Sequence, residues 1–201
     1  MGAMQGVPAV EVTSACGYIG AMSNASPEPA TIPLLPILIA PHPVLKARAR
    51  RVITSDNDAI RDLIPRMFAA MYNAPGIGLA APQVGLSLRM AVVDIAENEK
   101  RNPIVLVNPE IIASSQELSV REEGCLSLPN MFAEVTRPAR VKVRFEDESG
   151  VKRELEADGL LATCLQHEID HLDGVLFVDH ISALKRNMIM RKLAKEQRLK
   201  P

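Results

Sequence analysis

The sequence predicts an α+β protein in which antiparallel or mixed β-sheets pack around a central helix, with a further helix toward each end. Two observations lead to this prediction. Between residues 88 and 156, short runs rich in β-branched residues alternate apolar and polar positions, which is typical of strands. One segment with helical spacing precedes these runs and two follow them.

Size and composition allow one compact unit. The 201 residues fit one domain, or one domain with tails, and 47% of them are hydrophobic, which is enough for a sizeable core. The net charge of −1 gives the whole molecule no bias toward nucleic acid or an anionic membrane. The cysteines, Cys16, Cys125 and Cys164, are too few for a disulfide scaffold and favour a reducing compartment.

Residues 1–33 are expected to form an extension with little structure. Residues 1–31 contain no Lys or Arg, whereas a secretory signal begins with basic residues and a mitochondrial transit peptide is rich in arginine. Prolines interrupt the apolar stretch Ile32–Leu45, which excludes a membrane helix. An expression remnant within the extension and an alternative start at Met22 both stay open. Residues 34–201 are predicted to form a single catalytic domain.

A first helix is predicted from the capping residues Ser55–Asn57 to about Tyr72. Pro65 within it is expected to kink the helix or to displace its start. The sequence Asn73–Gly76 then ends it. The apolar positions recur at helical spacing: Ile60, Leu63, Ile64, Met67, Phe68 and Met71.

Strands are predicted downstream, where β-branched residues cluster and alternate. They are Leu88–Ile95, Ile104–Asn108, Ile111–Val120, Arg140–Glu146 and Val151–Glu156. The sequence Glu148–Gly150 is typical of a hairpin turn between the last two.

A second helix is predicted from Asp158, a good N-cap, to the residue before Gly174, which suits the position after a helix end. Both of its sides are apolar, so the helix should be buried, and a buried histidine needs a partner. One side holds Leu160, Cys164, His167 and His171, and the other Ala162, Leu165, Ile169 and Leu172. A last helix, Ser182–Lys200, closes the chain.

Within the second helix, His167-Glu168-Ile169-Asp170-His171 is the strongest functional signal. Residues four apart lie on one face of a helix, so both imidazoles can reach one metal ion. Glu168 would then lie beside a water on that metal, placed to take its proton. The alternative is a charged turn with two surface histidines, and the apolar surroundings of the histidines disfavour it.

Two histidines leave a catalytic metal one protein ligand short. Phe177 stands where the extended H-E-x-x-H-x-x-G-x-x-H motif requires a third histidine, which excludes that arrangement. Asp179 and His180 are alternatives but are expected to be solvated polar residues. Cys125 is the favoured ligand, presented as a thiolate by a loop at Glu122–Ser127. Cys164 is expected to be a small wall residue one turn before His167.

The segment Gly76–Gly85 is rich in small residues, which permits close approach by a substrate or by another strand. It is not a dinucleotide-binding motif, because the glycine spacing fails at Ala81, and it lacks the lysine of a phosphate loop. Gln83 could donate a hydrogen bond to a developing oxyanion, although a lone glutamine is more often structural.

In order and in spacing, these three stretches resemble the peptide deformylase family. Gly76–Gln83 is similar to its first motif, Glu123–Ser127 to its second and Gln166–His171 to its third. The resemblance runs from about Ile37 to the C-terminus. It implies metal-dependent hydrolysis of the N-terminal formyl group from N-formylmethionyl nascent polypeptides, with release of formate.

The resemblance also implies a ligand set and a cofactor. Cys125, His167 and His171 would bind one divalent metal per chain, with Fe²⁺ as the physiological ion and Zn²⁺, Ni²⁺ or Co²⁺ as substitutes. The substrate-binding residues would be Ile77, Gly78, Glu123, Gly124, Leu160, Thr163 and Cys164.

Three catalytic roles follow from the same resemblance. Glu168 would be the general base, and the Gln83 amide and the Leu126 N–H would stabilise the oxyanion. Arg137 and Asp170 could form a charge pair that steadies the ligands, or be two solvated charges. Phe132 stands where some family members carry an arginine near the substrate entrance, which leaves the preferences of the outer pocket open.

The expected partners are N-formylmethionyl nascent peptides and the ribosome. The C-terminal helix is similar to that of Gram-negative-type family members, and its basic side chains indicate docking near the exit tunnel. A basic, solvated helix end is the alternative. The chain is expected to be a monomer in the bacterial cytoplasm, without membrane contact.

Two other functions stay in view. A zinc peptidase or other amidase would cleave internal peptide bonds and use a third ligand other than Cys125. A non-catalytic metal-binding adaptor is disfavoured, because Glu168 is not needed to bind a metal.

Overall fold

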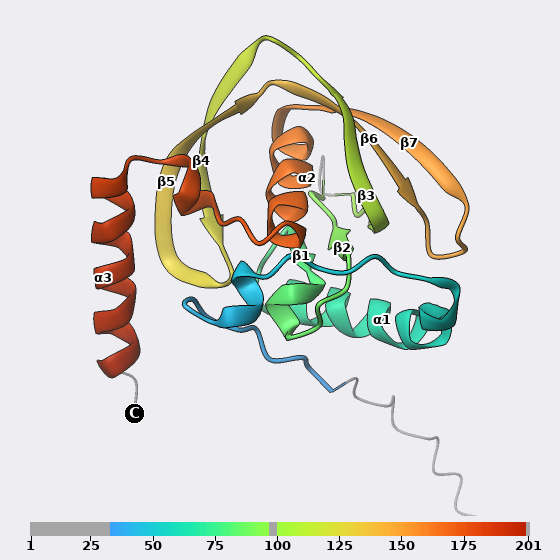
Figure 1. Ribbon diagram of the computed structural model, residues 1–201, viewed down its shortest axis with the longest axis horizontal. Helices are drawn as coiled ribbons and strands as arrows, with labels where there is room; N and C mark the ends of the chain where they lie inside the picture. The colour runs from blue at the N-terminus through green and yellow to red at the C-terminus, as the bar shows by residue number, and fades with distance from the viewer. Residues whose placement is uncertain (1–32, 97–99, 200–201) are drawn as a thin grey trace, which may run out of the picture. The chain divides into compact units, whose positions relative to one another are not determined.

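A computed structural model describes residues 33–96 and 100–199 (Figure 1), all within the compact unit Ile32–Pro201. Two predictions concern residues 1–33: little structure in the N-terminal extension, and an alternative start at Met22. Of these residues only Pro33 is described, so both predictions lie outside the described part of the chain. Across the described ranges, no helix combines the length and apolar character needed to cross a membrane.

The described strands form two sheets, one with the strand order β1-β2-β3-β6-β7 and one made of β4 and β5. The larger sheet contains β1 (Gly78–Ala80), β2 (Met90–Val93), β3 (Ile104–Ser114), β6 (Arg140–Glu146) and β7 (Lys152–Asp158). The smaller contains β4 (Leu118–Cys125) and β5 (Leu128–Pro138). All neighbouring strands of both sheets pair antiparallel.

The helices are α1 (Asn57–Asn73), α2 (Gly159–Leu172) and α3 (Ala183–Leu199). Figure 1 shows α2 between the two sheets and α3 on the outer side of β5. The predicted α+β class is therefore confirmed.

The side chains of α2 that face the larger sheet explain its central place. Leu165 and Ile169 are buried in one apolar cluster with Val93, Leu106 and Val143. Asp158 occupies the N-cap position, as predicted, although its side chain makes no capping hydrogen bond. Gly174 follows the C-cap with a φ of 75°, and a Cβ there would lie 2.6 Å from the Lys46 carbonyl oxygen.

Only some of the predicted strands have the expected bounds. Arg140–Glu146 has the predicted bounds, and the turn before β7 is confirmed by the hydrogen bond from Gly150 N to Asp147 O at 2.9 Å. A single strand over Ile111–Val120 is wrong, because β3 continues from Ile104 to Ser114 and β4 starts afresh at Leu118. Asn108 adopts a positive φ of 51° beside a register shift, which bends β3 without ending it.

Pro65 does not displace the start of α1, which begins at Asn57 and runs through Pro65. The proline lies on the exposed side of the helix, where water can bind the Arg61 carbonyl that loses its helical hydrogen bond. Of the two predicted effects of Pro65, a displaced helix start is therefore wrong, and a kink stays a prediction.

The contact between α3 and the rest of the domain depends on few side chains. Leu193 is buried in a cluster that includes Leu128 and Phe177, and Gln197 Nε2 donates to the Ala40 carbonyl at 3.0 Å. In contrast, Leu184 and Met188 are 73% and 63% exposed. One face of α3 covers the core, and the other is free of the domain.

Candidate active site

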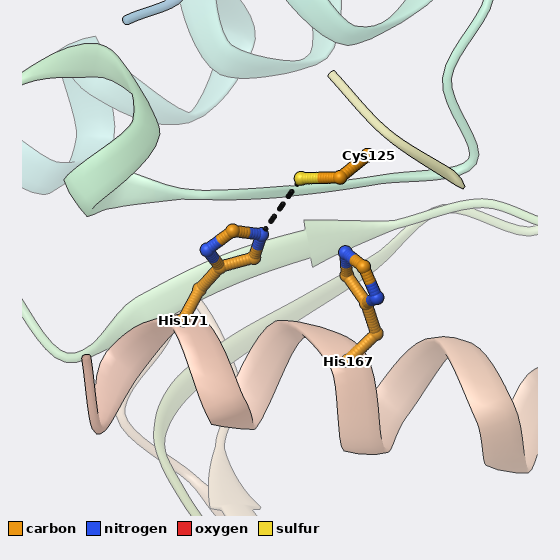
Figure 2. A group of neighbouring side chains, drawn as sticks. All are labelled: Cys125, His167 and His171. Carbon is orange, nitrogen blue, oxygen red and sulfur yellow. Dashed lines mark hydrogen bonds between the residues drawn. The ribbon is translucent and has the colours of Figure 1, made fainter. Parts of the chain in front are cut away.

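Cys125, His167 and His171 converge between β4 and α2. One donor atom from each side chain lies within 4.8 Å of the other two. Figure 2 shows both imidazoles rising from the same face of α2 toward the thiol, with Cys125 Sγ 3.2 Å from His171 Nε2. A thiolate and two imidazoles form a donor set that suits a divalent ion of borderline softness, so the residues present fit the predicted metal.

Cys125 is the last residue of β4, so the predicted loop at this position is wrong. The pairing with β5 shifts between Gly124 and Cys125, where the strand turns sharply toward Leu128. The expectation of a loop came from the small and polar neighbours of Cys125. They are tolerated in a strand here because β4 lies at the edge of a two-stranded sheet.

The histidines are buried, as the two apolar sides of the helix predicted. Only 8% of His167 and 1% of His171 is exposed. His171 Nδ1 is buried and has no hydrogen-bond partner among the described residues. The alternative of two surface histidines is therefore wrong.

A buried carboxylate orients His167. Glu123 Oε2 lies 2.9 Å from His167 Nδ1, and the guanidinium of Arg137 holds Glu123 through two hydrogen bonds of 2.6 and 3.0 Å. Burial alone would raise the pKa of Glu123, but the hydrogen bonds from His167 and Arg137 hold it at about 2. A charged Glu123 on Nδ1 leaves Nε2 to face the metal position.

Arg137 also donates to Asp170 at 2.8 Å and is itself only 6% exposed. The predicted charge pair is therefore confirmed, and the alternative of two solvated charges is wrong. Sequence reasoning missed the link from Arg137 through Glu123 to His167. The available signal was alternation along the strand, because Glu123 and Cys125 lie two residues apart and so face the same side.

Glu168 lies beside this group with an unsatisfied oxygen. It is 4% exposed, and Oε2 has no hydrogen-bond partner within the described part of the chain. Burial raises the pKa of Glu168 to about 7. Gly78 packs directly against this carboxylate, and a Cβ at that position would overlap it. Such a group can take up and release a proton near neutral pH.

The side-chain amide of Gln83 has a fixed orientation. Its Oε1 accepts from Ala80 N at 2.8 Å, which leaves Nε2 as the end near Cys125 Sγ, at 3.6 Å, and Ser127 Oγ, at 3.2 Å. Gln83 is 1% exposed. A hydrogen-bond donor therefore lies at the edge of the ligand group.

A cavity of about 590 Å³ opens beside these residues. Its wall includes Gln83, Cys125, Leu126, His167 and Glu168. It also includes all the predicted substrate-binding residues, Ile77, Gly78, Glu123, Gly124, Leu160, Thr163 and Cys164. The side chain of Glu123 is occupied by His167 and Arg137, so any contact of this residue with a substrate is expected from its backbone.

The residues considered as alternative third ligands lie outside the ligand group. Asp179 pairs with Lys46 and Arg186, and His180 Nε2 lies 2.7 Å from Asp170. These contacts correct the expectation that both are merely solvated. Phe177 is 1% exposed and stacks on the His167 ring, with 6.3 Å between the ring centroids.

A Cys-His-His group with buried imidazoles, and a carboxylate of raised pKa beside it on an α+β scaffold, defines a metallohydrolase. A family model described as polypeptide deformylase matches residues 34–187, more than half of the chain. The chain belongs to the peptide deformylase family and is a hydrolase that removes the N-terminal formyl group from peptides.

Individual relatives agree with this assignment. A peptide deformylase of Agrobacterium fabrum is 51% identical over 166 residues, which cover 82% of this chain and 97% of the relative. The crystal structure of a peptide deformylase from Legionella pneumophila has a TM-score of 0.78 and 48% identity, covering 84% of this chain and 100% of that one. A peptide deformylase from Synechococcus elongatus, solved in complex with actinonin, has a TM-score of 0.75 and 44% identity, covering 83% and 91%.

Proposed function

We propose that this chain removes the formyl group from N-formylmethionyl nascent chains at the Cys125–His167–His171 group, with Glu168 as general base. The observation that carries the proposal is the Glu168 carboxylate, which is buried, has one unpartnered oxygen and lines the cavity next to His167. A structural carboxylate would have its hydrogen bonds satisfied.

The chain's own residues divide the reaction between them. When bound, a divalent ion supplies a Lewis acid and makes water a better nucleophile at neutral pH. Glu168 accepts the proton of the attacking water and later returns it to the departing amine nitrogen. Its pKa of about 7 suits both transfers, because neither protonation state is strongly disfavoured at neutral pH.

Charge that develops on the formyl oxygen needs donors that are already in place. Gln83 Nε2 and the Leu126 N–H are the proposed donors. Among the described residues, no carbonyl accepts from the Leu126 N–H, so this group is available. The Ala80 N–H holds the Gln83 amide in the donating orientation before the substrate arrives.

The substrate path lies between two sheet edges. β1 is an edge strand of the larger sheet, and β4 has a free edge in the smaller one. Both Gly78 of β1 and Gly124 of β4 line the cavity. An extended peptide can therefore form backbone hydrogen bonds with either edge, and the cavity between Leu160 and Cys164 takes the methionine side chain.

We propose Fe²⁺ as the physiological ion, as the family resemblance implies. Zn²⁺, Ni²⁺ or Co²⁺ can substitute, because one thiolate and two imidazoles suit several borderline metals. The decisive measurement is the metal content of anaerobically purified protein together with release of formate from a formyl-methionyl peptide. We expect about one ion per chain and turnover that is lost on chelation and restored by Fe²⁺. Cleavage of internal peptide bonds without formate release would favour the peptidase alternative.

The exposed side of α3 is the proposed ribosome contact. Its basic side chains without an ion-pair partner in the described ranges are Lys185, Arg191, Lys195 and Arg198. The opposite side buries Leu193 in the core, so deletion of α3 would expose apolar surface. Charge removal is therefore a cleaner test than truncation.

Replacement of these four basic residues by glutamine should weaken ribosome binding by on the order of tenfold or more at low salt, because each cation contacting an RNA phosphate contributes salt-dependent affinity. Cosedimentation with ribosomes across a salt series measures the loss, and a formyl-peptide assay on the same preparations should show unchanged turnover. A matched variant in which the exposed Arg51, Arg61, Lys100 and Lys152 are replaced by glutamine controls for the loss of four positive charges. Equal losses in both variants would leave α3 as a solvated cap.

Formylated nascent chains arise where bacterial ribosomes work, so we place the activity in the bacterial cytoplasm. One chain supplies every proposed ligand and catalytic residue. The proposed active unit is therefore the monomer.

A further inference from the structure

His180 lies at the outer end of a hydrogen-bonded series of side chains that ends at the ligand His167. Its Nε2 is 2.7 Å from Asp170 Oδ2, and the same oxygen accepts from Arg137 Nη1 at 2.8 Å. Arg137 in turn holds Glu123, whose Oε2 lies 2.9 Å from His167 Nδ1. The series therefore connects the metal position with the short helix η5 (Phe177–His180) by way of α2, β5 and β4.

The side chains of this series become more buried from His180 toward Glu123. His180 and Asp170 are 34% and 23% exposed, whereas Arg137 and Glu123 are 6% and 4% exposed. Buried charges need partners, so the two inner groups depend on each other. Loss of the His180 side chain would leave the inner ion pair in place, but with one contact fewer to fix its position.

Asp170 fixes the plane of the Arg137 guanidinium. Nε and Nη2 of Arg137 donate to Glu123, and Nη1 donates to Asp170. A guanidinium is planar and its donors point in fixed directions, so two carboxylates on different edges set its orientation. Asp170 is held in turn by His180. A carboxylate can only accept, so Nε2 of His180 is the donor of that bond.

The backbone of η5 holds His180 in place for this bond. Phe177 and Val178 are buried in an apolar core cluster, and Asp179 Oδ2 accepts from Leu176 N at 2.8 Å. His180 therefore reaches Asp170 from a turn that is fixed on both counts. Because the backbone is already ordered, formation of the hydrogen bond restricts only the side chain.

We infer that His180 is a positioning residue for the metal site. Its hydrogen bond to Asp170 fixes Arg137, and Arg137 fixes the Glu123 carboxylate that orients the ring of the ligand. The inference rests on the ligand set of the proposed function. His180 does not line the cavity, so its effect is on retention of the ion and on kcat, with no direct contact to the substrate. What position 180 needs is a side chain that donates an N–H.

The test uses two substitutions that separate hydrogen bonding from packing. His180→Phe keeps a ring of similar size but cannot donate, whereas His180→Gln keeps an N–H donor with a similar reach. The measurement is loss of visible absorption from the Co²⁺-loaded protein in excess chelator. Loss of the direct partner of a ligating histidine costs roughly 10- to 100-fold in metal affinity, and His180 acts at a greater distance. We therefore expect release to be about three- to tenfold faster in His180→Phe and near the wild-type rate in His180→Gln.

Activity should follow the same order. His180→Phe should lower kcat and leave KM unchanged, and His180→Gln should restore kcat. The matched control is His42→Phe, which replaces another exposed histidine and should release Co²⁺ at the wild-type rate. In an Asp170→Ala background the series is already broken, so His180→Phe should cause no further acceleration.

Three outcomes would overturn the inference. One is equal release rates in the wild type and His180→Phe. Another is release from His180→Gln as fast as from His180→Phe, because packing of the ring would then be what matters. The third is full additivity of His180→Phe and Asp170→Ala, which would show that His180 acts by another route. A wild-type protein that binds no Co²⁺ at all would refute the ligand set of the proposed function, and the inference with it.

Discussion

Replacement of Glu168 by glutamine is expected to lower kcat by on the order of 10²-fold or more, while the metal content stays near one ion per chain. The amide has nearly the shape of the carboxylate but cannot accept the proton of the attacking water. Glu168 is not one of the three converging ligands, so the ion should stay bound. Single-turnover kinetics with metal analysis on the same sample measure both quantities.

The matched control is Glu110→Gln, which removes an exposed carboxylate from β3 that does not line the cavity. It should retain the wild-type rate. If Glu168→Gln keeps more than about a third of the wild-type kcat, the assignment of Glu168 as general base is wrong. If the metal is lost as well, Glu168 holds the ion rather than moving a proton.

Replacement of Cys125 by alanine is expected to abolish both metal binding and turnover. Two histidines on one helix are left, and a structural or catalytic ion of this type needs at least three protein ligands. Metal content after dialysis, formate release and the thermal midpoint are measured together. A Cys125→Ala protein with full metal content would remove Cys125 from the ligand set.

Cys164→Ala is the control for loss of a thiol near the same cavity. Burial raises the pKa of Cys164 well above its usual range, so this thiol stays protonated and is a poor ligand. Its Sγ lies 3.6 Å from the Ile77 carbonyl, and it packs in the core beside Leu165. This variant should keep most of the metal and most of the activity, with a modest loss of stability.

The long-range part of the site was harder to predict from sequence than its individual residues. The two histidines could be predicted as ligands from sequence, because residues four apart on a helix lie on one face. The glutamate that follows the first histidine marks the pattern as catalytic. Cys125 had to be chosen by elimination and by family resemblance. Its position depends on a register shift in β4, which no local pattern specifies.

The same limit explains the missed and misplaced strands. β1 consists of Gly78-Leu79-Ala80, which has low strand propensity, and it forms only because β2 pairs with it. The break between β3 and β4 depends on the turn where Ser115 Oγ donates to Glu117 O at 2.8 Å. The orientation of His167 by Glu123 likewise became visible only with the strand alternation of β4 in place.

The ligands Cys125 and His171 are 46 residues apart in the chain. Their separation also affects how long the protein stays folded. The first belongs to the two-stranded sheet, and the second belongs to the helix that packs on the five-stranded one. A two-stranded sheet alone is at best marginally stable in water. An ion bound by both Cys125 and His171 would join the two-stranded sheet to α2. It would close a long loop of the chain as a disulfide does, but without the need for an oxidant, and it could be removed. Depletion of the metal would then loosen the hairpin as well as stop the reaction, so the supply of the metal would govern the lifetime of the protein together with its rate.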